Sequence, residues 1–310
     1  MDRRVFLCNN AIATLVIGGR MALPQGITGS TVPRRQLGRH LRDLRNRARM
    51  TTRVAAQRLE WSEAKIWRIE TGQTSLRSLD VEAMCRIYGA PEDAIEPLTT
   101  LARETKARGW WTEFSDVIDE GYEVYIGLEE AAARLTSYEN ELVPGLLQTE
   151  QYYRAVLAGA YPGISAEQLD RRVRVRTARQ SLLTRDESPL QLDVVIAEAV
   201  LWHRIGGDDV TRGQLDRLRK LAELPNVRLR LLPAECGYHH GMDAGRFVLL
   251  EFPTAAGEPT EPPVVYVESL TGSSYLDKEH EVDRYREAFA SVSSLAVEAL
   301  PVIETLRATV

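Results

Sequence analysis

The sequence predicts a multidomain protein, with an all-α N-terminal domain followed by a larger mixed α/β (α+β) domain. Between residues 33 and 108, apolar side chains recur every three to four positions in short segments, which is the spacing of packed helices. After Gly109, apolar runs alternate with amphipathic helices, which is the pattern of a sheet covered by helices. The predicted domains are therefore 33–108 and 109–310, behind an extension over 1–32.

Charge divides the chain near the same place. The segment from Arg34 to Ala90 carries 13 Lys and Arg against 6 Asp and Glu, a balance of +7. The segment from Pro91 to Val310 carries 23 against 37, a balance of −14. A basic segment on an acidic body indicates that the segment binds a polyanion and that the body has another role.

Composition narrows the class of protein further. A hydrophobic content of 44% and a charged content of 27% are typical of soluble globular proteins. Cys8, Cys85 and Cys236 lie far apart without a CxxC pair, which favours a reducing compartment over a disulfide framework or a zinc site. We therefore expect a cytoplasmic protein with no metal and no cofactor.

The first 32 residues superficially resemble a secretory signal, with "MDRR" before an apolar run. Asn9 and Asn10 interrupt that run, which is also too short to span a bilayer, so we expect no membrane anchor. The preferred interpretation is a disordered extension or a start assigned too early, with the true start at Met21.

Three helices are predicted at the beginning of the N-terminal domain. Leu37, Leu41, Leu44 and Ala48 form one face of the first helix, in which Pro33 occupies an early position. Two short helices follow over 52–59 and 62–71, and Gly72 ends the second.

The rest of the N-terminal domain is also predicted to be helical. A fourth helix has Leu79, Ala83, Met84 and Ile87 inward and ends at Gly89. One further helix, or a broken pair, covers 91–109. The domain is thus compact and all-helical.

The larger domain is predicted to mix helices and strands. Helices are expected over 128–136, 150–158, 165–185 and 211–224 and through the tail 281–310, with strands over 190–201, 226–233, 245–252 and 263–269.

The two short helices have the properties of a helix-turn-helix. Ala56 supplies the small residue where the helices cross, and Leu59, Ile66 and Ile69 hold the second helix on the first. Ser62 is a suitable N-cap for the second helix.

Because Ile66 and Ile69 face inward, the opposite face of the second helix is predicted to contact DNA. The outward face of the second helix would then enter a major groove, where Arg68 pairs with guanine and Glu63 accepts from cytosine. Thr52, at the start of the preceding helix, and arginines of this region are placed for phosphates. The predicted DNA-binding residues are Arg39, Arg45, Thr52, Arg53, Ser62, Glu63, Ala64, Lys65, Trp67 and Arg68.

The stretch "TTRVAAQRLEWSEAKIWRIETGQ" resembles the helix-turn-helix of the Xre family, the lambda-repressor-like bacterial regulators. That resemblance implies double-stranded DNA as a partner. It covers about 55 residues, and one departure concerns the turn, where many members have Gly and this chain has Glu60. A positive φ at Glu60 would cost about 1 kcal/mol.

From about Trp110 to Ala299, the chain resembles the uncharacterised domain that follows the helix-turn-helix in WhiJ-like actinobacterial regulators. The resemblance is carried by "VPGLLQTEQYYRAVL", "RVRVRTARQ", "VVIAEAVLWHRIGG" and "QLDRLRKLAELPNVRLRLLP". It implies a transcription regulator, often with a small acidic partner protein encoded nearby, whose body senses a small molecule, binds that partner or dimerises. We expect a homodimer, because one such helix contacts few base pairs.

Candidate ligand or partner residues of the body are Gln148, His239 and His240, and no catalytic residue is assigned. The Arg-rich helix over 165–185 is either a solvated helix paired to the acidic body or a phosphate-binding segment. The alternative function is an enzyme acting on a nucleotide or small metabolite, with DNA binding as autoregulation. Convergence of Cys236, His239, His240 and Glu235 would favour that alternative. We prefer the regulator, and we therefore expect it to be nucleoid-associated.

Overall fold

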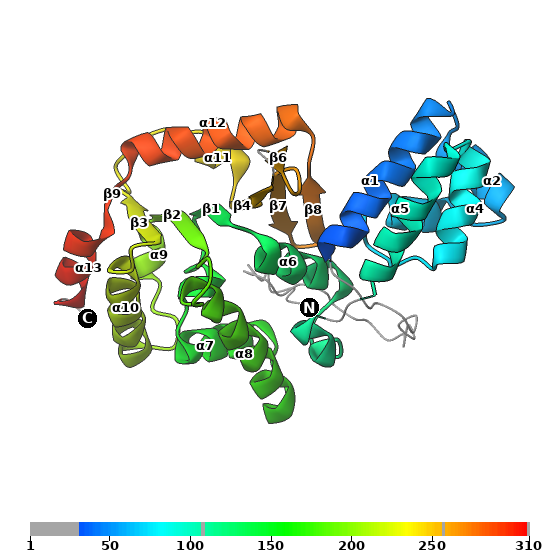
Figure 1. Ribbon diagram of the computed structural model, residues 1–310. Helices are drawn as coiled ribbons and strands as arrows, with labels where there is room; N and C mark the ends of the chain where they lie inside the picture. The colour runs from blue at the N-terminus through cyan, green and yellow to red at the C-terminus, as the bar shows by residue number, and fades with distance from the viewer. Residues whose placement is uncertain (1–30, 107–108, 256–257, 309–310) are drawn as a thin grey trace, which may run out of the picture. The chain divides into compact units, whose positions relative to one another are not determined.

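A computed structural model describes residues 31–106, 109–255 and 258–308 (Figure 1). The expectation for the N-terminal extension and for Met21 lies outside these residues. By their contacts, the described residues form two compact units, with the division between Leu128 and Glu129. The domain limits drawn from sequence, with a boundary at Gly109, stay a prediction.

The first unit is helical, as predicted. Its helices are α1 Thr31–Arg47, α2 Thr52–Leu59, α3 Glu63–Glu70, α4 Ser78–Tyr88 and α5 Glu92–Glu104, then a 3-10 turn η1 Trp110–Phe114 and α6 Glu120–Ala131, whose last residues belong to the second unit. Helices α1 to α5 share one core, centred on the fully buried Leu41, Ile66, Val81 and Met84.

The buried face of α4 differs from the predicted one. Leu79 is 76% exposed, whereas Val81, Met84, Cys85 and Tyr88 are buried. The predicted stripe and the observed stripe both have helical spacing, and the observed one buries a larger apolar set. Of the predicted inward residues, Met84 is confirmed and Leu79 was wrong.

The second unit contains a mixed sheet in the order β8-β7-β4-β1-β2-β3-β9. β1, β2 and β3 run parallel, and every other pairing is antiparallel. The strands are β1 Arg134–Glu139, β2 Gln191–Ala197, β3 Val227–Leu232, β4 Phe247–Glu251, β7 Val264–Ser269, β8 Gly272–Leu276 and β9 Val297–Glu298, with a separate pair β5 Thr254–Ala255 and β6 Glu258–Pro259. The mixed α/β class is confirmed.

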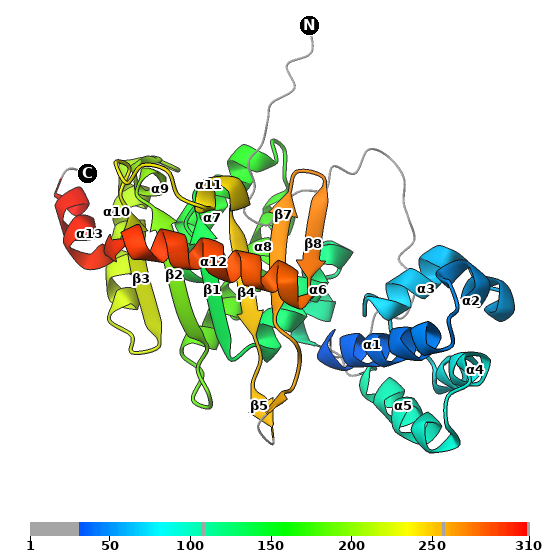
Figure 2. The same ribbon diagram turned by 90° about the horizontal axis from the view of Figure 1, so that it is seen from above.

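Helices lie on both faces of this sheet (Figures 1 and 2). α12 runs along one face, where its Val282, Ala288 and Val292 join a core with Tyr138 and Phe247 of the strands. α7, α8 and α10 lie on the other side. The helices are α7 Glu150–Ala160, α8 Ala166–Gln180, α9 Ala199–Trp202, α10 Asp208–Ala222, α11 Gly241–Ala244, α12 Glu279–Leu295 and α13 Ala299–Arg307, with short 3-10 turns η2 Gly145–Leu147 and η3 Ser181–Leu183.

Three predictions for this unit were wrong. The strand expected over 190–201 ends at Ala197, and helix α9 begins at Ala199. The helix expected over 128–136 ends at Ala131, and the central strand β1 begins at Arg134. The tail is not one helix, because β9 interrupts it after Ala296 and pairs with β3. Glu298 opposite Arg230 extends the sheet by one short edge strand.

Candidate nucleic-acid interface

Helices α2 and α3 are joined by a three-residue turn, and each helix begins with a side-chain N-cap. The Thr51 hydroxyl accepts from the Val54 amide at 3.2 Å at the start of α2, and the Ser62 hydroxyl accepts from the Lys65 amide at 3.2 Å at the start of α3. Glu60 is left-handed, with φ of 57° and ψ of 37°. The predicted cap at Ser62 and the unusual backbone at Glu60 are both present.

The inner side of this pair packs as the residue types predict. Ala56, Ile66 and Ile69 are buried, and Leu59 packs half-buried against the same core. A small residue was missed at Gly38 of α1, where a Cβ would lie 2.5 Å from the Ile69 carbonyl oxygen. α1 therefore crosses α3 at backbone contact distance, which fixes how α3 presents its outer face.

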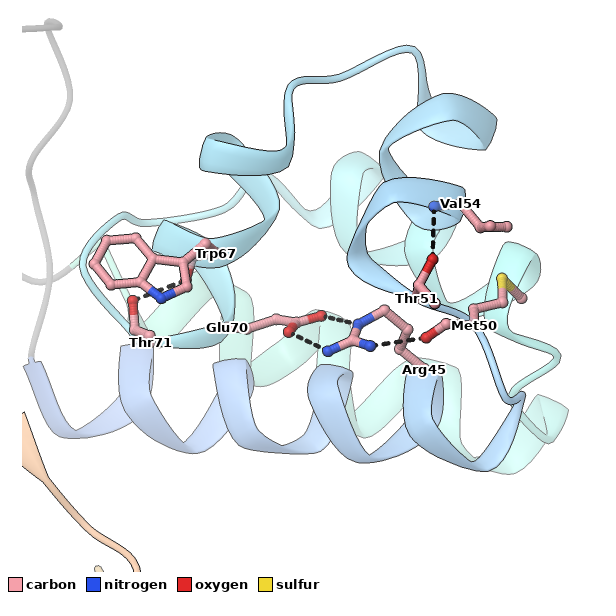
Figure 3. Close-up of polar contacts among 7 residues, drawn as sticks. All are labelled: Arg45, Met50, Thr51, Val54, Trp67, Glu70 and Thr71. Carbon is pink, nitrogen blue, oxygen red and sulfur yellow. Dashed lines mark hydrogen bonds and ion pairs between the residues drawn. The ribbon is translucent and has the colours of Figure 1, made fainter.

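Arg45 contributes to this packing rather than to an outer surface. From α1, its Nε and Nη2 donate to the two carboxylate oxygens of Glu70 at 2.6 and 2.7 Å, and its Nη1 donates to the Met50 carbonyl oxygen at 2.8 Å (Figure 3). The hydrogen bonds and charge of Glu70 raise the pKa of Arg45 against the opposing effect of burial. Because the guanidinium is buried and its donors are used within the domain, Arg45 is not placed for the phosphate contact predicted from sequence.

The outer side of α3 exposes the side chains that the sequence assigned to it. Glu63 and Ala64 are exposed, and Trp67 is 55% exposed and points away from Arg45 and Glu70 (Figure 3). Lys65 and Arg68 are half-buried. The face thus offers a carboxylate, a methyl group, an indole and two cations within two helical turns.

Lys65 is held close to the turn that precedes α3. Its Nζ lies 3.3 Å from the centre of the Trp61 ring, a cation–π contact. Burial there lowers the pKa of Lys65. Lys65 therefore presents its ammonium group from the start of α3, whereas Arg68 lies near its end.

Further cationic side chains of this unit come from α1, α2 and the connection between them. Arg53 is exposed on the first turn of α2, and Thr52 beside it is half-buried. Arg39 of α1 is half-buried. Further exposed arginines, which were not singled out from the sequence, are Arg47, Arg49 and Arg58.

The candidate residues of the body have different environments. His239 is buried edge-on against Tyr138, at 5.8 Å between ring centres, and burial lowers its pKa, whereas His240 is exposed. Gln148 is buried and donates to the Val143 carbonyl oxygen at 2.7 Å. Within the described residues, no three His, Cys, Asp or Glu side chains come together as a metal site.

The Arg-rich helix α8 uses two of its arginines internally. Arg179 donates to both carboxylate oxygens of the fully buried Glu129 at 2.6 and 2.7 Å. Arg176 is buried over the Tyr153 ring at 4.1 Å. Pairing within the acidic body accounts for these two arginines, so phosphate binding by α8 is not needed to explain them.

Comparisons with known proteins match two successive parts of the chain to two families. A family described as "Helix-turn-helix domain" matches residues 36–98, and one described as "Domain of unknown function (DUF5753)" matches residues 122–308. A search of curated proteins finds no match. Among the described helices, none has the length and apolar character needed to cross a membrane.

Proposed function

Because the chain belongs to the DUF5753 family and carries a DNA-binding helix-turn-helix ahead of that domain, we propose that it is a sequence-specific transcription regulator. The observation that carries this proposal is the outer face of α3, where Glu63, Ala64 and Trp67 are exposed beside two cations. The order of the two matched families is that of the regulators that the chain resembles.

In the proposed complex, α3 lies in the major groove. Arg68 donates to guanine O6 and N7, Glu63 accepts from cytosine N4, and Trp67 and Ala64 contact a thymine methyl group or sugar. Thr52, Arg53, Arg39 and the first amides of α2 contact phosphates, and the local balance of +7 supports this. Ser62 caps α3 and so positions the first base-contacting residues.

The body is proposed to dimerise and to receive a signal. A two-fold dimer places its two recognition helices about 34 Å apart, one turn of DNA. The signal is a small molecule or the small partner protein, and it changes DNA affinity only through different affinities for the two states of the regulator. Typical couplings of this kind are about 1–3 kcal/mol.

Selection of binding sites from a random duplex pool, followed by footprinting, tests the DNA-binding proposal. The full-length chain should enrich one motif with two-fold symmetry and protect it, and a chain with Arg68→Ala should lose the preference. Enrichment without any motif would contradict sequence-specific regulation. Light scattering with and without the selected duplex then tests the dimer.

A further inference from the structure

A hollow of about 540 Å³ lies on the α12 side of the sheet, beside α11. Its apolar lining consists of Ala244, Leu276, Tyr285 and Ala288. The Tyr285 ring packs edge-on against Phe247 with 4.9 Å between centres, so this part of the lining is held by the core. Figure 2 shows α11 beside the middle of α12, with the start of α12 near the strands at the β8 edge.

The hollow exists because the elements around it are short or carry small side chains. α11 ends at Ala244, and Gly245 with φ of 65° turns the chain away. Ala244 and Ala288 contribute only methyl groups to the lining. Small-molecule sites in proteins enclose about 300–1,000 Å³, so the volume is within the range for one compact ligand.

Charged side chains surround this apolar lining: Asp243 accepts a hydrogen bond from the Tyr238 hydroxyl, and Glu281 pairs with Lys278 outside the lining at 3.5 Å. With Lys278 counted, the balance is negative by one charge. Arg284 is flanked on the same helix by Glu281 and Glu287, at three positions before and three after it, which offsets its charge. In the part of the chain that the structure describes, Arg284, Glu287 and the two imidazoles make no hydrogen bond or ion pair. The polar lining residues are His240, Asp243, His280, Glu281, Arg284 and Glu287.

We propose that this hollow binds a small organic cation with a compact apolar body, such as an aromatic amine. The inference rests on the proposed function and names the chemistry of the effector. Three carboxylates against one guanidinium and the paired Lys278 leave one net negative charge, which attracts an ammonium group, while the tyrosine ring and the aliphatic lining accept the apolar body. An anion would meet the negative balance, and no described group of three ligands converges here for a metal ion.

The test uses two probes of nearly equal shape and opposite charge on the full-length chain. Tyramine carries an ammonium group on a two-carbon chain from a phenol, and 3-(4-hydroxyphenyl)propionate carries a carboxylate in its place. Amide resonances are followed by NMR during titration. Tyramine should shift amides of residues 240–245 and 276–288, and the acid should not shift them at the same concentration.

Two variants and a matched control locate the binding. Ala244→Phe fills the hollow without changing charge and should abolish the tyramine shifts. Glu287→Gln removes one exposed carboxylate and should weaken tyramine about two- to fivefold, the range of an exposed ion pair. Glu279→Gln, on the same helix but outside the lining, should leave the affinity unchanged.

Equal shifts with both probes, shifts scattered over the surface, or tyramine binding that survives Ala244→Phe would each overturn the proposal. Gel retardation with duplex DNA is measured on the same samples. DNA binding without tyramine binding would contradict the amine site and support the proposed regulator. Tyramine binding without DNA binding would contradict the proposed regulator and support an amine site.

Discussion

Removal of one partner of the Arg45–Glu70 pair should destabilise the helix-turn-helix far more than the same change in an exposed pair. The shortest N–O distance is 2.6 Å both for Arg45–Glu70 and for Arg86–Glu82. The side chains are 10% and 6% exposed in the first pair but 70% and 39% exposed in the second. Because the shortest distances are equal, the difference in energy comes from burial and from the second hydrogen bond of the Arg45–Glu70 pair.

Burial raises the free-energy cost of leaving a charge without its partner. Glu70→Leu leaves the Arg45 guanidinium buried without its carboxylate, which costs about 3–5 kcal/mol. Glu82→Leu removes an exposed pair one helical turn apart, which costs about 0.3–0.5 kcal/mol. In the double variant Arg45→Met/Glu70→Leu no charge is buried, and the remaining cost of about 1–2 kcal/mol comes from the Met50 carbonyl that loses its donor.

Amide hydrogen exchange in the full-length chain measures these costs locally, through the free energy of opening at Ile66 and Ile69. The expected order of stability is Glu82→Leu close to the unsubstituted chain, then the double variant, then Glu70→Leu. A loss below about 1 kcal/mol for Glu70→Leu, or a double variant no more stable than the single one, would refute the argument.

Four further substitutions are predicted together. Arg68→Ala should weaken the binding free energy by about 1–3 kcal/mol on the selected site and by little on unrelated duplexes, measured by titration. Arg53→Ala should weaken binding to all duplexes alike and should reduce the slope of log affinity against log salt concentration by about one. Uniform loss with Arg68→Ala would show that the two roles are exchanged. Glu60→Gly should raise the free energy of unfolding by about 1 kcal/mol, because the left-handed backbone strains a side chain there, and a decrease in urea melts would contradict this. Burial lowers the pKa of His239, so just below pH 6.5 the unfolded chain binds more protons than the folded chain, and stability falls as the pH falls. His239→Phe should flatten this dependence of the melting temperature on pH. An unchanged dependence would exclude His239 as its source.

The helix-turn-helix could be predicted from sequence because its signals are local. Ser62 and Gly72 delimit α3, and Ile66 and Ile69 fix which side faces inward. The predicted limits of α2 agree with the structure at both ends. Capping, spacing and turn geometry all act within a few residues, so the sequence contains the information directly.

The role of Arg45 could not be predicted, because sequence does not distinguish a buried arginine from an exposed one on a helix with seven arginines from Arg34 to Arg49. Its partner Glu70 is 25 positions away and belongs to another helix. The position of Gly38 opposite Ile69 was a possible signal, since a glycine inside a helix often marks a close crossing.

The strand β1 was missed because its interior is polar. Thr136, Ser137 and Glu139 are buried in the centre of the sheet, which removes the apolar run that identifies β2 and β3. Leu135 and Tyr138 alone are compatible with a helical spacing of three. The ligand candidates His239 and His240 are adjacent in sequence, but the side chain of His239 is buried and that of His240 is exposed. Adjacent residues therefore do not share one site here.

The central claim is that the basic N-terminal helices bind duplex DNA, and the salt dependence of binding by a fragment covering residues 31–108 tests it most directly. The predicted result is affinity for duplex DNA whose logarithm falls linearly with the logarithm of salt concentration, by about 0.9 for each phosphate contacted. Absence of salt-dependent binding to any duplex by this fragment, with its helices folded by circular dichroism, would contradict the account.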